Sequence, residues 1–303
     1  MKTVATLILV ILLSSTCLSQ QTPRVAIVDF SGDERGDMRS LLQSAAGEFE
    51  LLDAPQTRAA VRGAGYHGSL NLSRSEASDL GATIGCDFYF LGRVANLRRL
   101  GLENEGYFEC SAAVFLVEAQ SGQLILFDLP SASAPIEAKA YDGLLTTAKT
   151  RLSLYTRAIR TAFQKRVRLA SEPVDLLEET VEVLDGEVVA KGVVPPVFYQ
   201  RLKPTYTSEA ALANVAATVE LNAVFGQDGK VSRVDLVKWA GFGLDESAVA
   251  TVRAIRFRPA ERNGRPVNVL ALVRYNFVRP PSNAEREIEA EKLRRSLRQI
   301  GKP

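Results

Sequence analysis

Apolar and polar residues alternate along two stretches of the C-terminal half, and each alternation predicts a strand with one buried face. The first stretch places its apolar side chains at Val219, Leu221, Ala223 and Phe225. The second supplies its apolar residues at Val231, Val234, Leu236 and Val237. Asp228 and Gly229 stand between them, and glycine tolerates the positive φ that a tight turn requires. The two stretches therefore predict a β-hairpin.

After the hairpin the apolar spacing lengthens to three or four residues, which predicts a helix. Its apolar face consists of Leu244, Ala248, Val252 and Ile255. Pro259 ends this segment, because proline disfavours helical geometry in the residue before it. Asn263-Gly264 then predicts a turn, and Val269–Phe277 predicts the last strand. We expect the helix to cover a small antiparallel sheet.

The N-terminal half mixes short apolar runs with helical stretches, which is typical of a mixed α/β sheet. Ser73 and Glu76 form a capping box, so a helix is expected to begin there and to run to about Ile84. The predicted strands are 25–30, 49–52, 88–94, 107–118 and 124–127. The other predicted helices are 38–46, 55–62 and 138–168.

The fold class predicted from these patterns is α+β with two domains. The first is an N-terminal mixed α/β sheet domain, and the second has a small antiparallel sheet packed by helices. The linker between them contains a hairpin signal at Asp185-Gly186. The expected divisions are a signal peptide at 1–19, the first domain at 22–168, an acidic linker with a hairpin at 169–195, the second domain at 196–281, and a charged helical tail at 282–303.

The formal net charge of the 303-residue chain is +2, which is too small to indicate a nucleic-acid partner. Charge is concentrated locally instead. The predicted helix 138–168 has one apolar stripe, made of Leu145, Ala148, Leu152, Tyr155, Ile159 and Ala162. Its remaining surface carries Lys149, Arg151, Arg157, Arg160, Lys165, Arg166 and Arg168. Two interpretations stay open: the acidic linker neutralises this surface, or an anionic partner or membrane surface binds it.

The N-terminus has the form of a secretory signal peptide. Lys2 precedes an apolar run from Leu7 to Leu13, and small residues follow, so we expect cleavage near Ser19 and a periplasmic mature chain. The run is shorter than the roughly 20 residues that span a bilayer. The alternatives are an uncleaved N-terminal anchor and a lipoprotein acylated at Cys17, although Ser14-Ser15-Thr16 lacks the leucine of a lipidation box.

Cys86 and Cys110 would lie in an oxidising compartment after export. If residues 87–97 and 106–118 pair as a hairpin, Cys86 lies opposite the region of Val117. The two cysteines are then roughly 20 Å apart, which is far beyond the reach of a disulfide. We expect two buried free thiols.

Catalytic motifs are missing from the sequence. His67 is the one histidine, and there is neither a Gly-x-Ser-x-Gly elbow nor a metal-ligand spacing of His or Cys. Residues 63–68 fit G-x-G-x-x-G, but they follow a helix and lead into a polar loop. We expect no enzyme activity, no cofactor and no metal. A catalytic pair of carboxylates stays open, because spacing in the sequence does not reveal one.

Residues 196–280 contain four short motifs: Pro204-Thr205-Tyr206, Leu244-Asp245, Phe257-Arg258-Pro259-Ala260 and Gly264-Arg265-Pro266-Val267. These motifs resemble those of the C-terminal domain of TonB, the energy transducer of Gram-negative bacteria. Thr207 stands where that family usually has proline, and Ile255 stands where tryptophan is frequent. The resemblance implies a domain that binds partners and does no chemistry.

Four segments of the N-terminal half are informative: Val25-Ala-Ile-Val-Asp-Phe30, Asp79-Leu-Gly-Ala-Thr-Ile-Gly-Cys-Asp87, Leu91-Gly92 and Val117-Glu-Ala-Gln-Ser-Gly122. With these segments, about residues 22–168 are similar to the N-terminal domain of TolB and to the domain of the curli secretion protein CsgG, both of the bacterial envelope. The similarity implies a domain used for protein contacts in the periplasm.

In the TonB family an extended receptor peptide pairs with the edge of the last strand. The resemblance therefore assigns partner binding to Val269, Leu270, Ala271, Leu272, Val273, Arg274 and Tyr275, with Lys203, Pro204 and Tyr206 nearby. The implied partners are outer-membrane or envelope proteins, with the membrane contacted only indirectly. The alternative is that another part of the chain, such as the hairpin before Val194, covers this edge.

The predicted function is a non-catalytic periplasmic adaptor that binds envelope or outer-membrane proteins by strand addition, with a link to TonB-type transport. Residues 168–194 do not form the long proline-rich spacer of a true transducer, which argues against energy transduction itself. The alternative function is an envelope assembly scaffold in which the TonB-like domain only oligomerises, for example as a homodimer.

Overall fold

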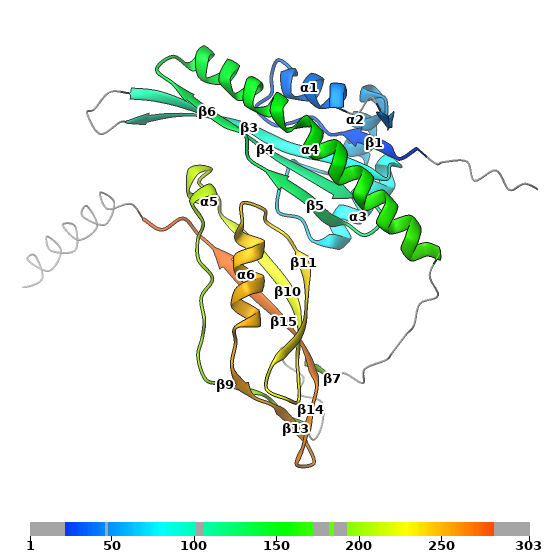
Figure 1. Cartoon of the computed structure of the whole chain (residues 1–303), viewed down its shortest axis with the longest axis vertical. Coiled ribbons are helices and arrows are strands. Elements are labelled where there is room, and N and C mark those ends of the chain that lie inside the picture. Colours follow the sequence, from blue (N-terminus) through cyan, green and yellow to red (C-terminus); the bar gives the residue numbers. More distant parts are fainter. Residues whose placement is uncertain (1–21, 46–47, 101–105, 172–181, 185–192, 282–303) are drawn as a thin grey trace, which may run out of the picture.

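The computed structural model describes residues 22–45, 48–100, 106–171, 182–184 and 193–281 (Figure 1). Three predictions lie outside these residues: the signal peptide at 1–19, the hairpin turn at Asp185-Gly186 and the helical tail at 282–303. The described part is a mixture of helices and strands in two domains, as the apolar patterns predicted.

The N-terminal domain is built on one mixed sheet with the strand order β2-β1-β3-β4-β5, and β6 also pairs with β4. Strand β1 is parallel to β2 and β3, whereas β4 is antiparallel to β3, β5 and β6. The strands are β1 (Arg24–Ile27), β2 (Glu50–Leu51), β3 (Phe88–Leu100), β4 (Gly106–Glu118), β5 (Gln123–Asp128) and β6 (Ser131–Ala134).

Helices cover both faces of this sheet. The helices are α1 (Asp37–Ala45), α2 (Ala54–Gly63), α3 (Arg74–Ile84) and α4 (Glu137–Ser171). Alternate residues of β4 point to opposite faces. Ala112 and Val114 pack with α1 and α4 in one core cluster, while Ala113 and Phe115 pack with α3 in the other. The predicted apolar stripe of α4 faces the first cluster.

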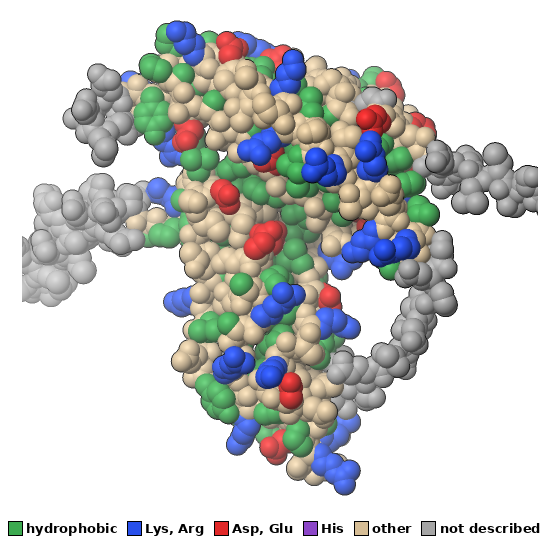
Figure 2. Space-filling model, in the orientation of Figure 1, with side chains coloured by type: hydrophobic (Ala, Val, Ile, Leu, Met, Phe, Trp, Pro, Cys, Tyr) green, Lys and Arg blue, Asp and Glu red, His purple; other side chains and the backbone are tan. Residues whose placement is uncertain are grey.

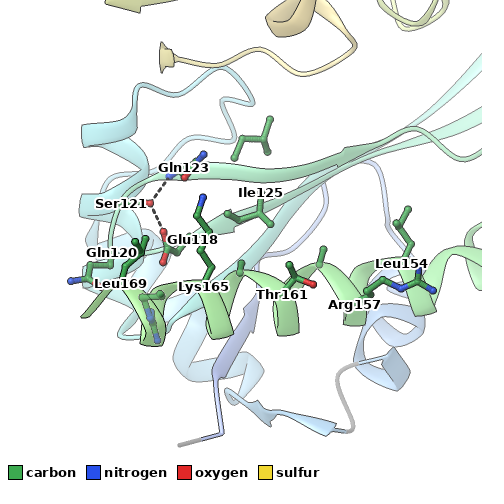
Figure 3. Close-up of a pocket in the computed structure, with 14 residues that line it drawn as sticks. Glu118, Gln120, Ser121, Gln123, Ile125, Leu154, Arg157, Thr161, Lys165 and Leu169 are labelled. Atoms are coloured by element: carbon green, nitrogen blue, oxygen red, sulfur yellow. Dashed lines mark hydrogen bonds between the residues drawn. The ribbon is translucent and has the colours of Figure 1, made fainter. Parts of the chain in front are cut away.

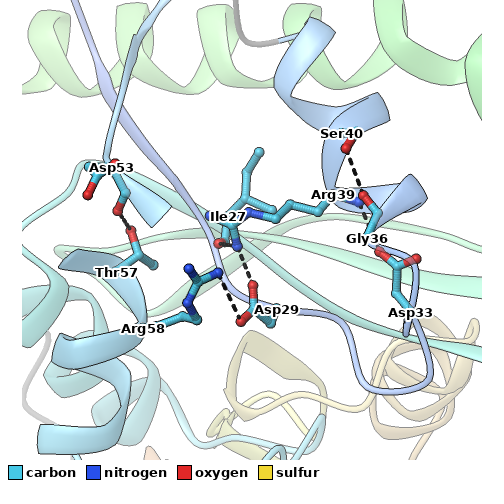
Figure 4. Close-up of polar contacts among 9 residues, drawn as sticks. All are labelled: Ile27, Asp29, Asp33, Gly36, Arg39, Ser40, Asp53, Thr57 and Arg58. Carbon is cyan, nitrogen blue, oxygen red and sulfur yellow. Dashed lines mark hydrogen bonds and ion pairs between the residues drawn. The ribbon is translucent and has the colours of Figure 1, made fainter. Parts of the chain in front are cut away.

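An ion-pair cluster fixes α1 and α2 at the carboxyl end of β1 (Figure 4). The guanidinium of Arg39, on α1, donates to the carbonyl oxygen of Ile27 at 2.7 Å and to the Asp29 carboxylate at 2.5 Å. Arg58, on α2, pairs with the second oxygen of Asp29 at 3.7 Å. One carboxylate therefore joins the helices that follow the first two strands.

The C-terminal domain contains a four-stranded sheet with the order β11-β10-β15-β7. Helix α6 covers one face, and its side chains Leu244, Ala248 and Val252 are buried there. Two small ladders, β12-β9 and β14-β13-β8, lie at the end away from the first domain (Figure 1). The elements are β7 (Glu182–Leu184), β8 (Val193–Val194), β9 (Val197–Phe198), α5 (Ser208–Leu212), β10 (Ala217–Phe225), β11 (Val231–Lys238), α6 (Leu244–Arg253), β12 (Phe257–Arg258), β13 (Ala260–Arg262), β14 (Arg265–Val267) and β15 (Val269–Phe277).

The two domains share a hydrophobic core. Phe115 and Phe127 of the first sheet meet Trp239 and Phe242 of the second domain, with ring centroids 5.4 Å apart for Phe115–Trp239 and 4.5 Å apart for Phe127–Phe242. The indole nitrogen of Trp239 donates to the carbonyl oxygen of Gly122 at 3.1 Å. Because the indole is fully buried and its N–H has an acceptor, no polar group is left unsatisfied there.

Two further residues adapt the loop between β11 and α6 to this contact. Gly241 has φ +73°, and a Cβ there would lie 2.7 Å from ring carbons of Phe115 and Phe127. Asn71, before α3, donates through its side-chain amide to the carbonyl oxygens of Thr218 at 2.8 Å and Trp239 at 2.7 Å. A side chain of the first domain thus satisfies backbone groups of the second.

The cysteine prediction is confirmed: Cys86 and Cys110 are both free thiols. Cys110 on β4 pairs with Asn96 on β3. Cys86 lies before the other end of β3, three residues before Tyr89, which pairs with Val117. The prediction of full burial holds for Cys110, whereas Cys86 is half-buried.

Candidate partner-binding site

The last strand, β15, is the centre of the predicted site. It pairs with β10 in antiparallel register along its whole length, from Val269↔Phe225 to Phe277↔Ala217. The hairpin of β10 and β11 lies on that side, turning at Gly229 with φ +75°. The other edge of β15 therefore decides whether the strand is open to a partner.

Part of that edge has a partner within the chain. Strand β7, from the acidic linker, runs parallel to β15 with the register Val269↔Glu182, Leu270↔Val183 and Ala271↔Leu184. Three of the seven predicted β15 residues are therefore paired. For Val269–Ala271 the structure therefore agrees with the predicted alternative, in which an element before Val194 covers the edge of the last strand.

The rest of the edge, from Leu272 to Phe277, has no second partner strand among the described residues. Leu272, Arg274 and Asn276 are exposed, and the Leu272 side chain is 51% exposed. Arg274 pairs with Glu220 of β10 at 2.7 Å. Val273 and Tyr275 are half-buried against the hydrophobic core. This segment combines unpaired backbone groups with one exposed apolar side chain, the form that strand addition uses.

Tyr206, the last of the three predicted residues before α5, lies near the other end of the strand. The hydroxyl of Tyr206 is 2.7 Å from the carbonyl oxygen of Val215, just before β10, and Ala217 at the start of β10 pairs with Phe277. Burial raises the pKa of Tyr206, whereas the positive charge of Arg279 lowers it. Pro204 is half-buried and Lys203 is exposed. Tyr206 thus has a structural role, near the open end of β15 and far from β7.

Thr207, which replaces the family's usual proline, has a clear local role. Its hydroxyl accepts from the backbone N–H of Ala210 at 3.1 Å and so caps α5. The same hydroxyl donates to the carbonyl oxygen of Phe242. Thr207 therefore ties α5 to the loop that contacts the first domain.

Sequence reasoning missed the role of Asp245, although Leu244-Asp245 was recognised as a motif. Asp245 is 6% exposed, and its carboxylate accepts from the backbone N–H groups of Ala240 at 2.8 Å and Gly241 at 2.9 Å. Burial raises the pKa of Asp245 to about 6, although the two N–H donors oppose the shift. The carboxylate holds the loop that carries Trp239 and Phe242 to the first domain.

The remaining family motifs form the far end of the domain. Phe257 packs against Phe225 with ring centroids 5.1 Å apart, and against Phe198 at 6.1 Å. Asn263 and Gly264 have φ +50° and +74° and turn the chain from β13 to β14, as the Asn-Gly pair predicted. Ile255 is buried, so the position where the family often has tryptophan is an aliphatic core position here.

The glycine-rich residues 63–68 begin at the last residue of α2 and continue into a loop, so they do not join a strand to a helix. No group of three or more His, Cys, Asp or Glu side chains that would suit a metal occurs in the described part. Among the described helices, none combines the length and apolarity needed to cross a membrane.

Comparison with known proteins identifies one family. Residues 203–278 match the family described as Gram-negative bacterial TonB protein C-terminal. No curated protein matches the chain.

Parts of this chain are also similar to solved protein structures. The TonB C-terminal domain of Pseudomonas aeruginosa is 14% identical, with 32% of this chain and 95% of that chain covered and a TM-score of 0.26. The LpoB C-terminal domain of Salmonella enterica is 15% identical, with coverages of 37% and 83% and a TM-score of 0.27. Lipoprotein GNA1162 of Neisseria meningitidis is 15% identical, with coverages of 50% and 99% and a TM-score of 0.29.

The similarity of residues 22–168 to the TolB and CsgG domains stays a prediction. The family match covers the lead-in at Tyr206, the motif at Asp245 and the whole of β15. The C-terminal domain of this chain belongs to the TonB C-terminal family.

Proposed function

We propose that this protein is a non-catalytic adaptor of the Gram-negative envelope that binds a partner protein by strand addition to β15. The partner strand would lie along Leu272–Phe277, the part of the edge that β7 leaves unpaired. The observation that carries the proposal is this unpaired edge in a domain of the TonB C-terminal family. Main-chain hydrogen bonds would supply affinity, and Leu272 and Arg274 would select the partner's side chains.

The proposal includes the location and the division of the chain. A basic start and a short apolar run support export to the periplasm, with a signal peptide at residues 1–19. The C-terminal domain would span 196–281. The partner would be an outer-membrane or other envelope protein, because the family is that of the Gram-negative TonB protein.

Co-purification of the full-length protein from solubilised Gram-negative envelopes tests the proposal. The variant Leu272→Asp places a charge on the unpaired edge, so at least one envelope partner retained by the wild type should be lost. Ser232→Asp is the matched control, because Ser232 is also exposed and lies on β11, the opposite edge strand of the same sheet.

The same partner set for wild type, Leu272→Asp and Ser232→Asp would contradict strand addition at β15. Light scattering on the purified chain separates the scaffold alternative. A homodimer that Leu272→Asp dissociates, with no envelope partner bound, would mean that the edge serves only self-association.

A further inference from the structure

A second surface of the protein is the groove between β5 and α4, which has a volume of about 820 Å³ (Figure 3). Gln123, Leu124 and Ile125 form the β5 side, and Leu154, Ala158, Thr161, Ala162, Lys165 and Leu169 form most of the α4 side. Ligand pockets measure roughly 300–1,000 Å³, so the β5–α4 groove has room for a short peptide.

The groove lies along an open sheet edge. Strand β5 ends the strand order of the first sheet and has no second neighbour among the described residues. Ile125 is an extra residue on β5, since Leu124 and Leu126 pair with consecutive β4 residues, Val117 and Leu116. Such a bulge redirects a side chain, and Ile125 lies on the groove side together with Leu154 (Figure 3). The floor of the groove is therefore apolar.

Lys and Arg side chains gather on the side of the N-terminal domain where α4 runs (Figure 2). Three of the basic residues have acidic partners within the same domain: Arg151 with Asp128 at 3.9 Å, Arg160 with Glu48, and Arg166 with Asp87 at 2.6 Å. Acidic side chains of the first domain thus neutralise part of the basic surface of α4. From the sequence, we considered only the acidic linker for this role.

Two cations of the groove are left without an ion-pair partner in the described part of the chain, namely Arg157 and Lys165. Both are exposed. The one acid of the groove, Glu118, accepts a hydrogen bond from the Ser121 hydroxyl. The groove therefore presents two available positive charges beside an apolar floor.

The spacing of these cations indicates the ligand. Arg157 and Lys165 are eight residues apart on one side of a helix that rises about 1.5 Å per residue, so they are roughly 12 Å apart along α4. In an extended peptide, side chains four residues apart share a face and are about 13 Å apart. Two carboxylates at positions i and i+4 would match both cations. The residue at i+2 would face the floor between them.

We propose that the β5–α4 groove binds an extended segment of a partner protein with acidic side chains at i and i+4 and an apolar side chain at i+2. This site is separate from β15, so the adaptor would hold two partners, or two parts of one partner, on different domains. A lipid with one anionic headgroup would satisfy only one of the two cations.

Fluorescence anisotropy of the full-length protein with the labelled peptide Gly-Glu-Ser-Val-Ser-Glu-Gly tests this proposal. Arg157→Glu and Lys165→Glu should each weaken binding about fivefold, since each reverses one charge contact. Lys149→Glu is the matched control: Lys149 is exposed on α4 outside the groove, so its reversal should change binding less than about twofold. Thr161→Trp fills the groove without changing charge and should abolish binding.

Circular dichroism verifies that each variant is folded. The proposal is overturned if the peptide fails to bind at millimolar concentration, if its lysine-for-glutamate counterpart binds equally well, or if Lys149→Glu weakens binding as much as Lys165→Glu. It is also overturned if phosphatidylglycerol vesicles bind through Arg157 and Lys165 while the peptide does not, because the face would then serve a lipid surface.

Discussion

At the scale of single residues, Asp245 has the most consequence. A buried carboxylate with two backbone donors fixes the loop from Trp239 to Phe242. Its folded-state pKa of about 6 exceeds the ordinary value of 3.8, so the folded state binds a proton more tightly than the unfolded state. The stability from this proton is fully present below about pH 3.8 and is lost as the pH rises through about 6.

We therefore predict that Asp245→Asn removes a pH-dependent part of the unfolding free energy, on the order of 3 kcal/mol for a shift of about two pKa units. Urea unfolding between pH 4 and pH 7.5 measures it. Relative to Asp245→Asn, the wild type should gain stability as the pH falls. A constant difference for Asp245→Asn would contradict the role given to this proton.

At the scale of elements, the pairing of β7 with β15 divides the proposed partner-binding edge in two. A proline in β7 removes a backbone N–H and cannot join a ladder interior. We predict that Val183→Pro raises amide hydrogen exchange at Val269–Ala271 and leaves Leu272–Phe277 unchanged. Mass spectrometry of the exchanged protein measures this. Unchanged exchange at Val269–Ala271 would mean that β7 does not protect this edge in solution.

Long elements could be predicted from the sequence and very short ones could not. The α4 stripe and the strands β10 and β15 have many alternating or helically spaced apolar residues. The predicted bounds of α4 and β15 agree with the structure to within three residues. Strand β6, Ser131–Ala134, consists of small residues without an alternating apolar pattern. It is a strand because it pairs with β4. Helix α5 and the two-residue strands β8, β9 and β12 are likewise set by tertiary contacts.

For the candidate site, the sequence predicted the position of the strand β15 but not which part of its edge is paired. The family motifs located β15, but its pairing with β7 depends on a contact between residues about 87 positions apart, which no local pattern encodes. The domain contact at Trp239 was missed for the same reason. Burial of one tryptophan between two domains leaves no periodic signal.

At the scale of the whole molecule, the shared core should make the two domains unfold together. Trp239 is the single tryptophan and is fully buried between them, so its fluorescence reports on the contact. We predict that fluorescence and far-ultraviolet circular dichroism show the same urea midpoint. Trp239→Ala should destabilise the protein by about 3–5 kcal/mol and separate two calorimetric transitions. A fluorescence change at lower urea than the loss of dichroism would show that the domains separate first.

The turn between β4 and β5 has a practical consequence for labelling. Exposed hairpin tips usually tolerate inserted tags and fluorophores. Here three successive carbonyl oxygens of the turn are in use: Gln120 accepts from the Ser78 hydroxyl at 3.0 Å, Ser121 from Arg74 at 3.1 Å, and Gly122 from Trp239 at 3.1 Å. A tag inserted at this tip would break the hydrogen bonds that α3 and the second domain make to the turn. A probe should therefore not be attached at this hairpin tip.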